Sequence, residues 1–218
     1  MYAINYTIRK INQGQKKYLN DLLSLYEDTL QNEIIMDGGV LSPWSYKNIV
    51  SVALRVNRYD WVETFIHDYK DRMASRFREN AFNYNFANLS FHRKEFDKAL
   101  VSLTQVEFSD IYYNLDSKLL MLKVFYELDE TEALLSHIHA FKIYLRRTQL
   151  ISSYMQEVYW NLAEYTRQLT KFSTQSKERL LKLKEEVQSV KKVADLNWLL
   201  EKIEETILQL KEWGHSAM

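Results

Sequence analysis

Cysteine is absent from the 218 residues of this chain. Its absence excludes disulfides, thiolate metal ligands and a cysteine nucleophile, and it fits a reducing and an oxidising compartment equally well. Turn-forming residues are scarce, with four Gly and one Pro against an average usage of roughly 7% and 5%. A many-stranded β fold needs more such residues, so we expect an all-α protein.

Long apolar runs are also missing, because no stretch reaches the roughly 18 residues needed to cross a bilayer. The N-terminal sequence MYAINYTIRKINQGQ lacks the apolar core of a secretory signal. We therefore expect a cytoplasmic protein without a membrane partner.

The chain also lacks a net charge, since 29 basic residues balance 29 acidic ones. Bulk electrostatics thus give no reason to expect a nucleic acid partner.

The chain does contain enough apolar residues, 46% of the total, for a sizeable core. Residues 83–100 read NYNFANLSFHRKEFDKAL and place apolar side chains at helical spacing on both sides of a polar break at residues 92–95. This pattern predicts a helix, a tight turn and a second helix. Similar breaks at residues 57–58 and 128–130 predict two more helical hairpins.

The hairpins recur along the chain. Their equivalent positions after the turn are Leu19, Val62, Ala99 and Ala133, and their separation shortens toward about 34 residues, the period of one helical-repeat class. This recurrence predicts an α-solenoid of antiparallel helical hairpins. A plain helical bundle whose hairpins happen to have similar lengths is the alternative.

The hairpin at residues 83–100 resembles a tetratricopeptide repeat. Ala87 and Ala99 occupy the family's two small positions, Phe96 its aromatic position, and Tyr84 and Asn85 precede Ala87 as in the consensus. The neighbouring hairpins are degenerate: Met121, Val50 and Val62 replace small residues, while Ala133 and Ala140 are kept. The family's glycine after the first helix and its terminal proline are missing from all three hairpins.

Two regions follow from this organisation. Residues 1–150 are expected to form about four tetratricopeptide-like hairpins, and residues 151–218 long helices that cap the end of the solenoid. We expect one helix over residues 152–172. Two more are expected after residue 176, with a break near residues 193–195, because a single helix there would be about 55 Å long.

The first hairpins carry two irregular features. Residues 32–43 form an insertion in which Gly38 and Gly39 predict a turn, and Ser42 and Pro43 predict the N-cap and first turn of the next helix. The N-terminal end is aromatic and aliphatic where a solenoid usually has a polar cap. Either the chain is the C-terminal part of a longer protein, or it begins with an ordinary short helix; in both cases self-association through this end is an open expectation.

The five histidines, which are candidates for catalysis and metal binding, are His67, His92, His137, His139 and His215. His137 and His139 are two residues apart and so point to different faces of a helix, whereas helical metal ligands lie three or four apart. No nucleophile elbow, phosphate-binding loop or dinucleotide fingerprint occurs. We expect no catalytic residue, metal or cofactor, and a helical enzyme is the third functional class considered.

The resemblance to tetratricopeptide arrays implies a concave groove lined by the first helix of each hairpin. On this chain the groove positions are Trp44, Lys47, Ser51, Arg55, Tyr84, Asn85, Asn88, His92, Lys118 and Tyr126. Aromatic, amide and cationic side chains together suit a bound peptide. A generic hydrated concave surface is the alternative interpretation.

Chaperone-type arrays of this family grip the terminal carboxylate of a peptide with Lys, Asn and Arg side chains. Lys47 and Asn85 match that pattern, but Ser51, Leu115 and Leu119 occupy its other positions. The resemblance therefore does not imply a C-terminal peptide as the ligand.

The expected function is a non-catalytic protein-interaction scaffold with a protein or peptide partner. The alternative is a nucleic-acid-binding or regulatory helical-repeat domain, suggested by the basic residues Arg72, Arg76, Arg78, Lys142, Arg146 and Arg147. Acidic neighbours are interleaved with the first of these clusters, and Asp68 is expected to pair with Arg72 one helical turn later. Such pairing is typical of a solvated helix face.

Overall fold

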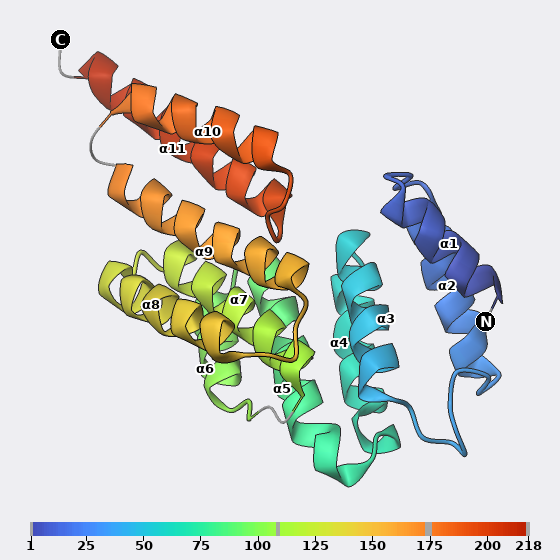
Figure 1. The fold of residues 1–218 in the computed structure, drawn as a ribbon. Helices are drawn as coiled ribbons and strands as arrows, with labels where there is room; N and C mark the ends of the chain where they lie inside the picture. Colours follow the sequence, from blue (N-terminus) through green and yellow to red (C-terminus); the bar gives the residue numbers. More distant parts are fainter. Residues whose placement is uncertain (1, 108–109, 173–175, 217–218) are drawn as a thin grey trace. The chain divides into compact units, whose positions relative to one another are not determined.

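The computed structural model describes residues 2–107, 110–172 and 176–216, without the side chains of residues 172 and 211–216. In these residues the chain is all-helical, as the sequence predicts, and contains no β-strand (Figure 1). The helices are α1 (Tyr2–Asn12), α2 (Tyr18–Gln31), α3 (Pro43–Arg55), α4 (Tyr59–Asp68), the 3-10 turn η1 (Lys70–Arg72), α5 (Ser75–His92), α6 (Phe96–Thr104), α7 (Ile111–Glu127), α8 (Thr131–Arg147), α9 (Ser153–Phe172), α10 (Lys177–Val190) and α11 (Leu196–Ser216).

The helices form two compact units, Met1–Ser117 and Lys118–Met218. The division falls inside α7. The sequence analysis instead places the boundary between its two regions after residue 150. Within each unit, helices pack against their neighbours along the chain: α1 to α6 in the first unit, and α8 to α11 in the second. The hairpin turns predicted at residues 57–58, 92–95 and 128–130 are confirmed, since each separates two helices.

One turn geometry recurs between paired helices. Gly14, Asn57, Lys94 and Asp129 each have a positive φ, between 57° and 86°. In all four turns the N–H of this residue donates to the carbonyl three residues earlier, and the next N–H donates to the carbonyl five residues earlier, at 2.8 to 3.2 Å. This is the Schellman arrangement that satisfies the last carbonyls of a helix. Three side-chain-bearing residues therefore occupy a position where glycine is the usual choice.

The core of the first unit explains why its helices approach closely. Ala87 of α5 and Ala99 of α6 are both completely buried, as expected of small residues at a helix contact. Tyr46 of α3 is also completely buried, and its hydroxyl donates to the carbonyl oxygen of Ile66 at 2.6 Å. Ile66 lies in the last turn of α4, where carbonyls lack partners within the helix. Tyr46 thus both fills the core and satisfies the end of α4.

The insertion before α3 contains a tight turn closed by a bridge between Asp37 and Val40. Gly38 and Gly39 have φ values of 55° and 78°, which confirms the predicted turn. Ser42 is confirmed as the N-cap of α3, because its Oγ accepts a hydrogen bond from the N–H of Ser45 at 3.0 Å.

The expected contact of Arg72 with Asp68 is replaced by contacts with the insertion. The Arg72 guanidinium lies 2.5 Å from a carboxylate oxygen of Glu33 and donates to the carbonyl of Gly39 at 3.2 Å. The insertion brings a carboxylate and a carbonyl to Arg72 together, so local helical spacing does not decide its partner.

The second unit contains the long helices expected near the C-terminal end. The predicted break near residues 193–195 is confirmed, because α10 ends at Val190 and α11 begins at Leu196. Asp195 in this break accepts a hydrogen bond from Lys123 of α7 at 2.6 Å, and the N–H of Ala194 donates to the carbonyl of Val158 of α9 at 3.1 Å. The connection between α10 and α11 is therefore fixed by both neighbouring helices.

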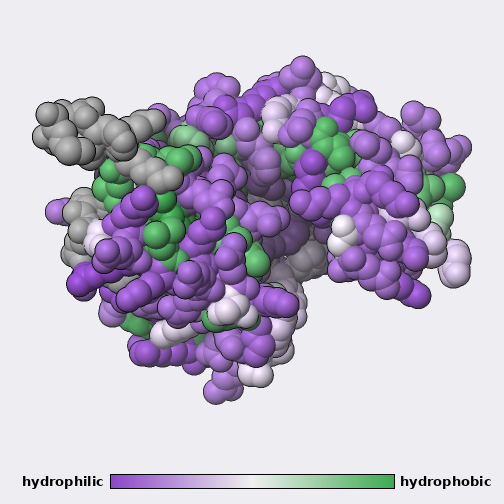
Figure 2. Space-filling view, turned by 90° about the horizontal axis from the view of Figure 1, so that it is seen from above, coloured by the Kyte–Doolittle hydropathy of each residue, from purple (hydrophilic) through white to green (hydrophobic). Residues whose placement is uncertain are grey.

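The surface seen in Figure 2 is mostly hydrophilic, with hydrophobic side chains in separate smaller areas. Scattered apolar side chains are normal on a protein surface. Among the described helices, none combines the length and the apolar character that crossing a bilayer requires.

Candidate functional site

A pocket of about 90 Å³ lies in the first unit where α3, α5 and α7 begin. We call it the aromatic pocket. Its apolar walls are Pro43 and Trp44 of α3, Phe77 and Ala81 of α5 and Tyr113 of α7, and its polar lining residues are Arg76, Asn80, Glu107 and Asp110. Concave, largely apolar sites with a few polar groups are where proteins most often bind ligands.

Local sequence signals place the helices around this pocket. Asp110 starts α7, because its carboxylate accepts hydrogen bonds from the N–H groups of Tyr112 at 2.9 Å and Tyr113 at 3.0 Å. The side chain of Asn80 in α5 holds the backbone of Glu107 through both its groups: its Oδ1 accepts from the N–H of Glu107 at 3.0 Å, and its Nδ2 donates to the Glu107 carbonyl. The pocket wall is therefore fixed by side chains acting on the backbone.

Two of the lining rings, Trp44 and Tyr113, are grouped with the ring of Tyr112 beside the pocket. Trp44 lies 5.3 Å from the ring of Tyr113 and 6.1 Å from that of Tyr112. Tyr113 is buried, which raises the pKa of its hydroxyl, and this hydroxyl donates to the carbonyl of Pro43 at 2.5 Å. Trp44 and Tyr112 remain 37% and 43% exposed. Two large amphipathic side chains are thus presented to solvent on a rigid base.

Lys47 is one of the predicted groove residues. Its buried side chain contacts the rings of Trp44 and Tyr113. Its Nζ lies 4.8 Å from the ring centroids of both Trp44 and Tyr113 and 2.5 Å from a carboxylate oxygen of Asp116. Lys47 therefore links α3 to α7 as a cation on aromatic faces, and the expectation that it faces an open groove is corrected.

Tyr84 and Asn85 require the same correction. Tyr84 is buried edge-on against Tyr113, with ring centroids 5.4 Å apart. Asn85 is completely buried and donates to the carbonyl of Ala81 at 2.7 Å, while its side-chain oxygen has no hydrogen-bond partner. Tyr113, in the first turn of α7, contacts both of these α5 side chains.

The remaining predicted residues of the first unit lie toward the C-terminal ends of α3 and α5. Arg55 is exposed and Ser51 is half-buried. The His92 ring lies 2.9 Å from the carbonyl of Asn88, and both side chains are half-buried. None of these four lines the aromatic pocket.

Lys118 and Tyr126 belong to the second unit. The Lys118 ammonium lies 5.1 Å from the ring centroid of Tyr144, and burial lowers its pKa. Tyr126 packs edge-on against Trp198 at 5.5 Å, and burial raises the pKa of its hydroxyl. Both side chains serve packing inside the second unit.

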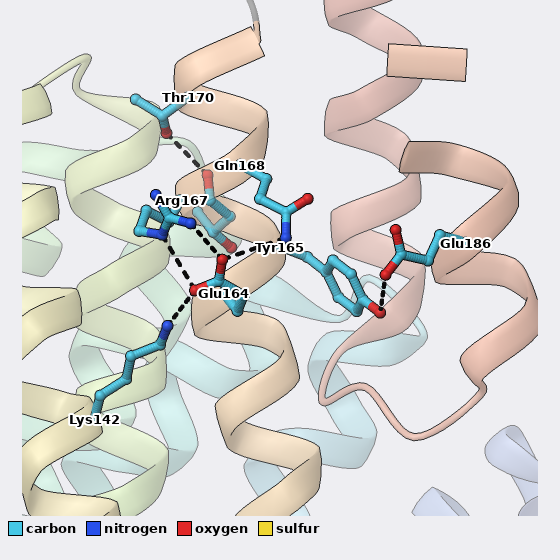
Figure 3. Close-up of polar contacts among 8 residues, drawn as sticks. Lys142, Glu164, Tyr165, Arg167, Gln168, Thr170 and Glu186 are labelled. Carbon is cyan, nitrogen blue, oxygen red and sulfur yellow. Dashed lines mark hydrogen bonds and ion pairs between the residues drawn. The ribbon is translucent and has the colours of Figure 1, made fainter. Parts of the chain in front are cut away.

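A charged cluster joins α8 to α9 in the second unit (Figure 3). Lys142 and Arg167 both reach the carboxylate of Glu164, Arg167 at 2.5 Å. The hydrogen bond from Arg167, followed by that from Lys142, holds the pKa of Glu164 at about 2. Both cations are therefore neutralised within the chain, which weakens the case for a phosphate-binding strip at Lys142.

Tyr165 follows Glu164 in α9 but points toward α10, where its hydroxyl donates to Glu186 at 3.1 Å (Figure 3). Burial, followed by this hydrogen bond, raises the pKa of Tyr165 to about 12. Successive residues of α9 thus connect it to two different neighbouring helices. The described part of the chain contains no group of three or more His, Asp or Glu side chains that could hold a metal ion.

The contribution of α7 to the aromatic pocket was missed in the sequence. Tyr112, Tyr113 and Asp116 lie in its first two turns and supply the exposed ring, the buried base and the partner of Lys47. A local signal for these residues is present in the sequence, because Asp110 is a typical helix N-cap residue and two adjacent tyrosines, Tyr112 and Tyr113, follow it. Comparison with family models, with curated proteins and with solved structures finds no match to this chain.

Proposed function

We propose that the chain is a non-catalytic protein-interaction scaffold built from tetratricopeptide-like helical hairpins. The observation that carries the proposal is the exposed pair Trp44 and Tyr112 beside the aromatic pocket. Tryptophan and tyrosine are enriched at the energetic centres of protein interfaces, because they bury a large area and keep a polar group for a hydrogen bond.

The hairpin geometry supports the repeat part of the proposal. The same Schellman turn closes the first helix of four hairpins, at Gly14, Asn57, Lys94 and Asp129. Ala87 and Ala99 are buried as the close contact of a tetratricopeptide hairpin requires. In this proposal the contact surface lies at the aromatic pocket, since Tyr84 and Asn85, two of the expected groove residues of α5, are buried against Tyr113.

The test compares partner retention by matched variants. Wild-type chain, a Trp44→Ala, Tyr112→Ala double variant and a Tyr154→Ala control are immobilised and exposed to extract treated with nuclease at high salt. Tyr154 is an aromatic residue of α9 in the second unit and is 55% exposed. We expect proteins that wild type and control retain and the double variant loses.

Two results would contradict the proposal. One is a retained set that the double variant keeps unchanged. The other is retention of nucleic acid alone, with an affinity that falls steeply as salt rises, which would favour the nucleic-acid alternative. The melting temperature of the double variant shows whether a loss of partners comes from unfolding.

A further inference from the structure

A second open groove of about 160 Å³ lies between α2 and α4 in the first unit and is lined by both helices. We call it the acidic aromatic groove. Trp61, Phe65 and Tyr69 follow one another at four-residue spacing along α4 and its C-cap, so they share one face. The Trp61 and Phe65 rings are stacked at 5.1 Å, and the Phe65 and Tyr69 rings at 4.8 Å.

Burial differs along this row of rings. Phe65 is buried at the base of the groove, whereas Trp61 and Tyr69 are half-buried. The two outer rings thus keep part of their surface accessible beside the buried Phe65 ring. An aromatic face attracts a cation through its quadrupole, and tryptophan does so most strongly.

The charged side chains that line the groove are acidic. Glu27 of α2 and Asp68 of α4 line it, and none of its described lining residues is Lys or Arg. Arg72, one turn after Asp68, directs its guanidinium to Glu33 and Gly39 instead. Arg58 reaches Glu27 only at 3.8 Å, so one carboxylate already attracts a guanidinium of the same chain.

We propose that the acidic aromatic groove binds an arginine side chain of a partner peptide. A guanidinium is planar, stacks on aromatic faces and donates two parallel hydrogen bonds to a carboxylate, which a lysine ammonium does not. The groove is large enough for this group and part of its stem, since one water needs roughly 10–15 Å³. The inference deepens the proposed interaction function through residues that do not line the aromatic pocket.

The test uses the complete chain and the indole N–H signals of its five tryptophans. The ¹⁵N-tryptophan-labelled protein is titrated with acetyl-Gly-Arg-Gly-amide and, separately, with the uncharged isostere acetyl-Gly-citrulline-Gly-amide. Single Trp→Phe variants assign the signals. We expect the Trp61 signal to shift saturably with the arginine peptide and the citrulline peptide to bind at least about tenfold more weakly.

Charge variants locate the site. Glu27→Gln with Asp68→Asn is expected to weaken arginine-peptide binding about tenfold, whereas Glu130→Gln with Glu132→Gln, an equal charge change on exposed residues of the second unit, is expected to leave it unchanged. If the first double variant fails to fold, Asp68→Asn alone replaces it, because Asp68 is exposed and no described ion pair involves it.

Several outcomes would overturn the inference: no shift of the Trp61 signal, equal affinity for the citrulline peptide, equal or tighter binding of acetyl-Gly-Lys-Gly-amide, or no effect of the charge variants. A shift of the Trp44 signal without one of Trp61 would also overturn it. That last result would leave the proposal for the aromatic pocket standing, so the two failures are distinguishable.

Discussion

Single side chains in this protein connect helices through atoms that the helices themselves leave unsatisfied. Tyr46 is the clearest case, because its hydroxyl reaches across the core to a carbonyl in the last turn of α4. Asn85 is the opposite case, with a buried side-chain oxygen that has no hydrogen-bond partner. A buried polar atom without a partner costs stability, whereas a satisfied one contributes modestly.

Tyr46→Phe tests the first contact. The substitution keeps the ring but removes the donor, so the Ile66 carbonyl loses its partner in the core. We expect the free energy of unfolding to fall by about 1–2 kcal/mol, measured by urea denaturation. Tyr26→Phe is the matched control, because Tyr26 is also buried but its hydroxyl donates to no described acceptor; an equal loss in both variants would contradict the role of the hydrogen bond.

Glu164→Gln tests the charged cluster through pH. The hydrogen bonds from Arg167 and Lys142 lower the pKa of Glu164 from 4.5 to about 2 in the folded state. Its contribution to stability is therefore complete above about pH 4.5 and is lost as the pH falls toward 2. We expect the variant to be less stable by about 1 kcal/mol at pH 7, because water screens a partly exposed cluster.

The stability difference between wild type and Glu164→Gln is measured by urea denaturation at pH 7, 5 and 3. The difference should be constant at and above pH 5 and smaller at pH 3. A difference that stays the same at all three pH values would show that the ionised carboxylate is not its source.

At the scale of helices, the Schellman turns carry a measurable cost. Lys94 has a φ of 61° and an exposed side chain, and a left-handed conformation costs a residue with a Cβ roughly 1–2 kcal/mol. Lys94→Gly is therefore expected to raise the free energy of unfolding by about 0.5–1 kcal/mol, net of the greater freedom that glycine gives the unfolded chain.

Lys98→Gly is the matched control for this turn. Lys98 is an exposed lysine inside α6, where glycine lowers helix stability by about 1 kcal/mol. Thermal unfolding should show a higher melting temperature for Lys94→Gly and a lower one for Lys98→Gly than for wild type. A loss of stability in Lys94→Gly as well would mean that its turn is not strained.

Ala99→Leu tests the close contact of α5 and α6. Ala99 is completely buried, so a larger side chain must displace its neighbours, and we expect a loss of about 1–3 kcal/mol. Val101→Leu on the exposed face of the same helix should change stability little, since Val101 is 65% exposed. A tolerated Ala99→Leu would indicate spare volume between the two helices.

The positions of the helices were easier to predict from the sequence than which of their faces are buried. Local periodicity and capping residues such as Ser42 locate each helix and turn, because those signals lie within a few residues. The burial of Lys47 and Asn85 depends on Tyr113 and Asp116, which are distant from them in sequence. No local pattern contains that contact, so the pocket could not be derived, although Trp44, which lines it, is among the predicted groove residues.

For the whole molecule, the balance of charge governs behaviour in solution. The formal net charge is zero at pH 7, and a protein without net charge repels its own copies least. We expect solubility to be lowest near pH 7 and higher at pH 5 and pH 9, measured by precipitation with polyethylene glycol. Lys177→Glu with Lys191→Glu should move the minimum to lower pH; a minimum that stays at pH 7 would point to apolar contacts.

The repeated turn has a consequence for building with this chain. Asn57 and Lys94 leave their helices in the same backbone conformation and with the same pair of hydrogen bonds. A gene that encodes residues 58–94 twice in succession would therefore repeat α4, η1 and α5, and the new junction would use a turn conformation that the chain already has. Two helices would be added in this way without a newly designed linker.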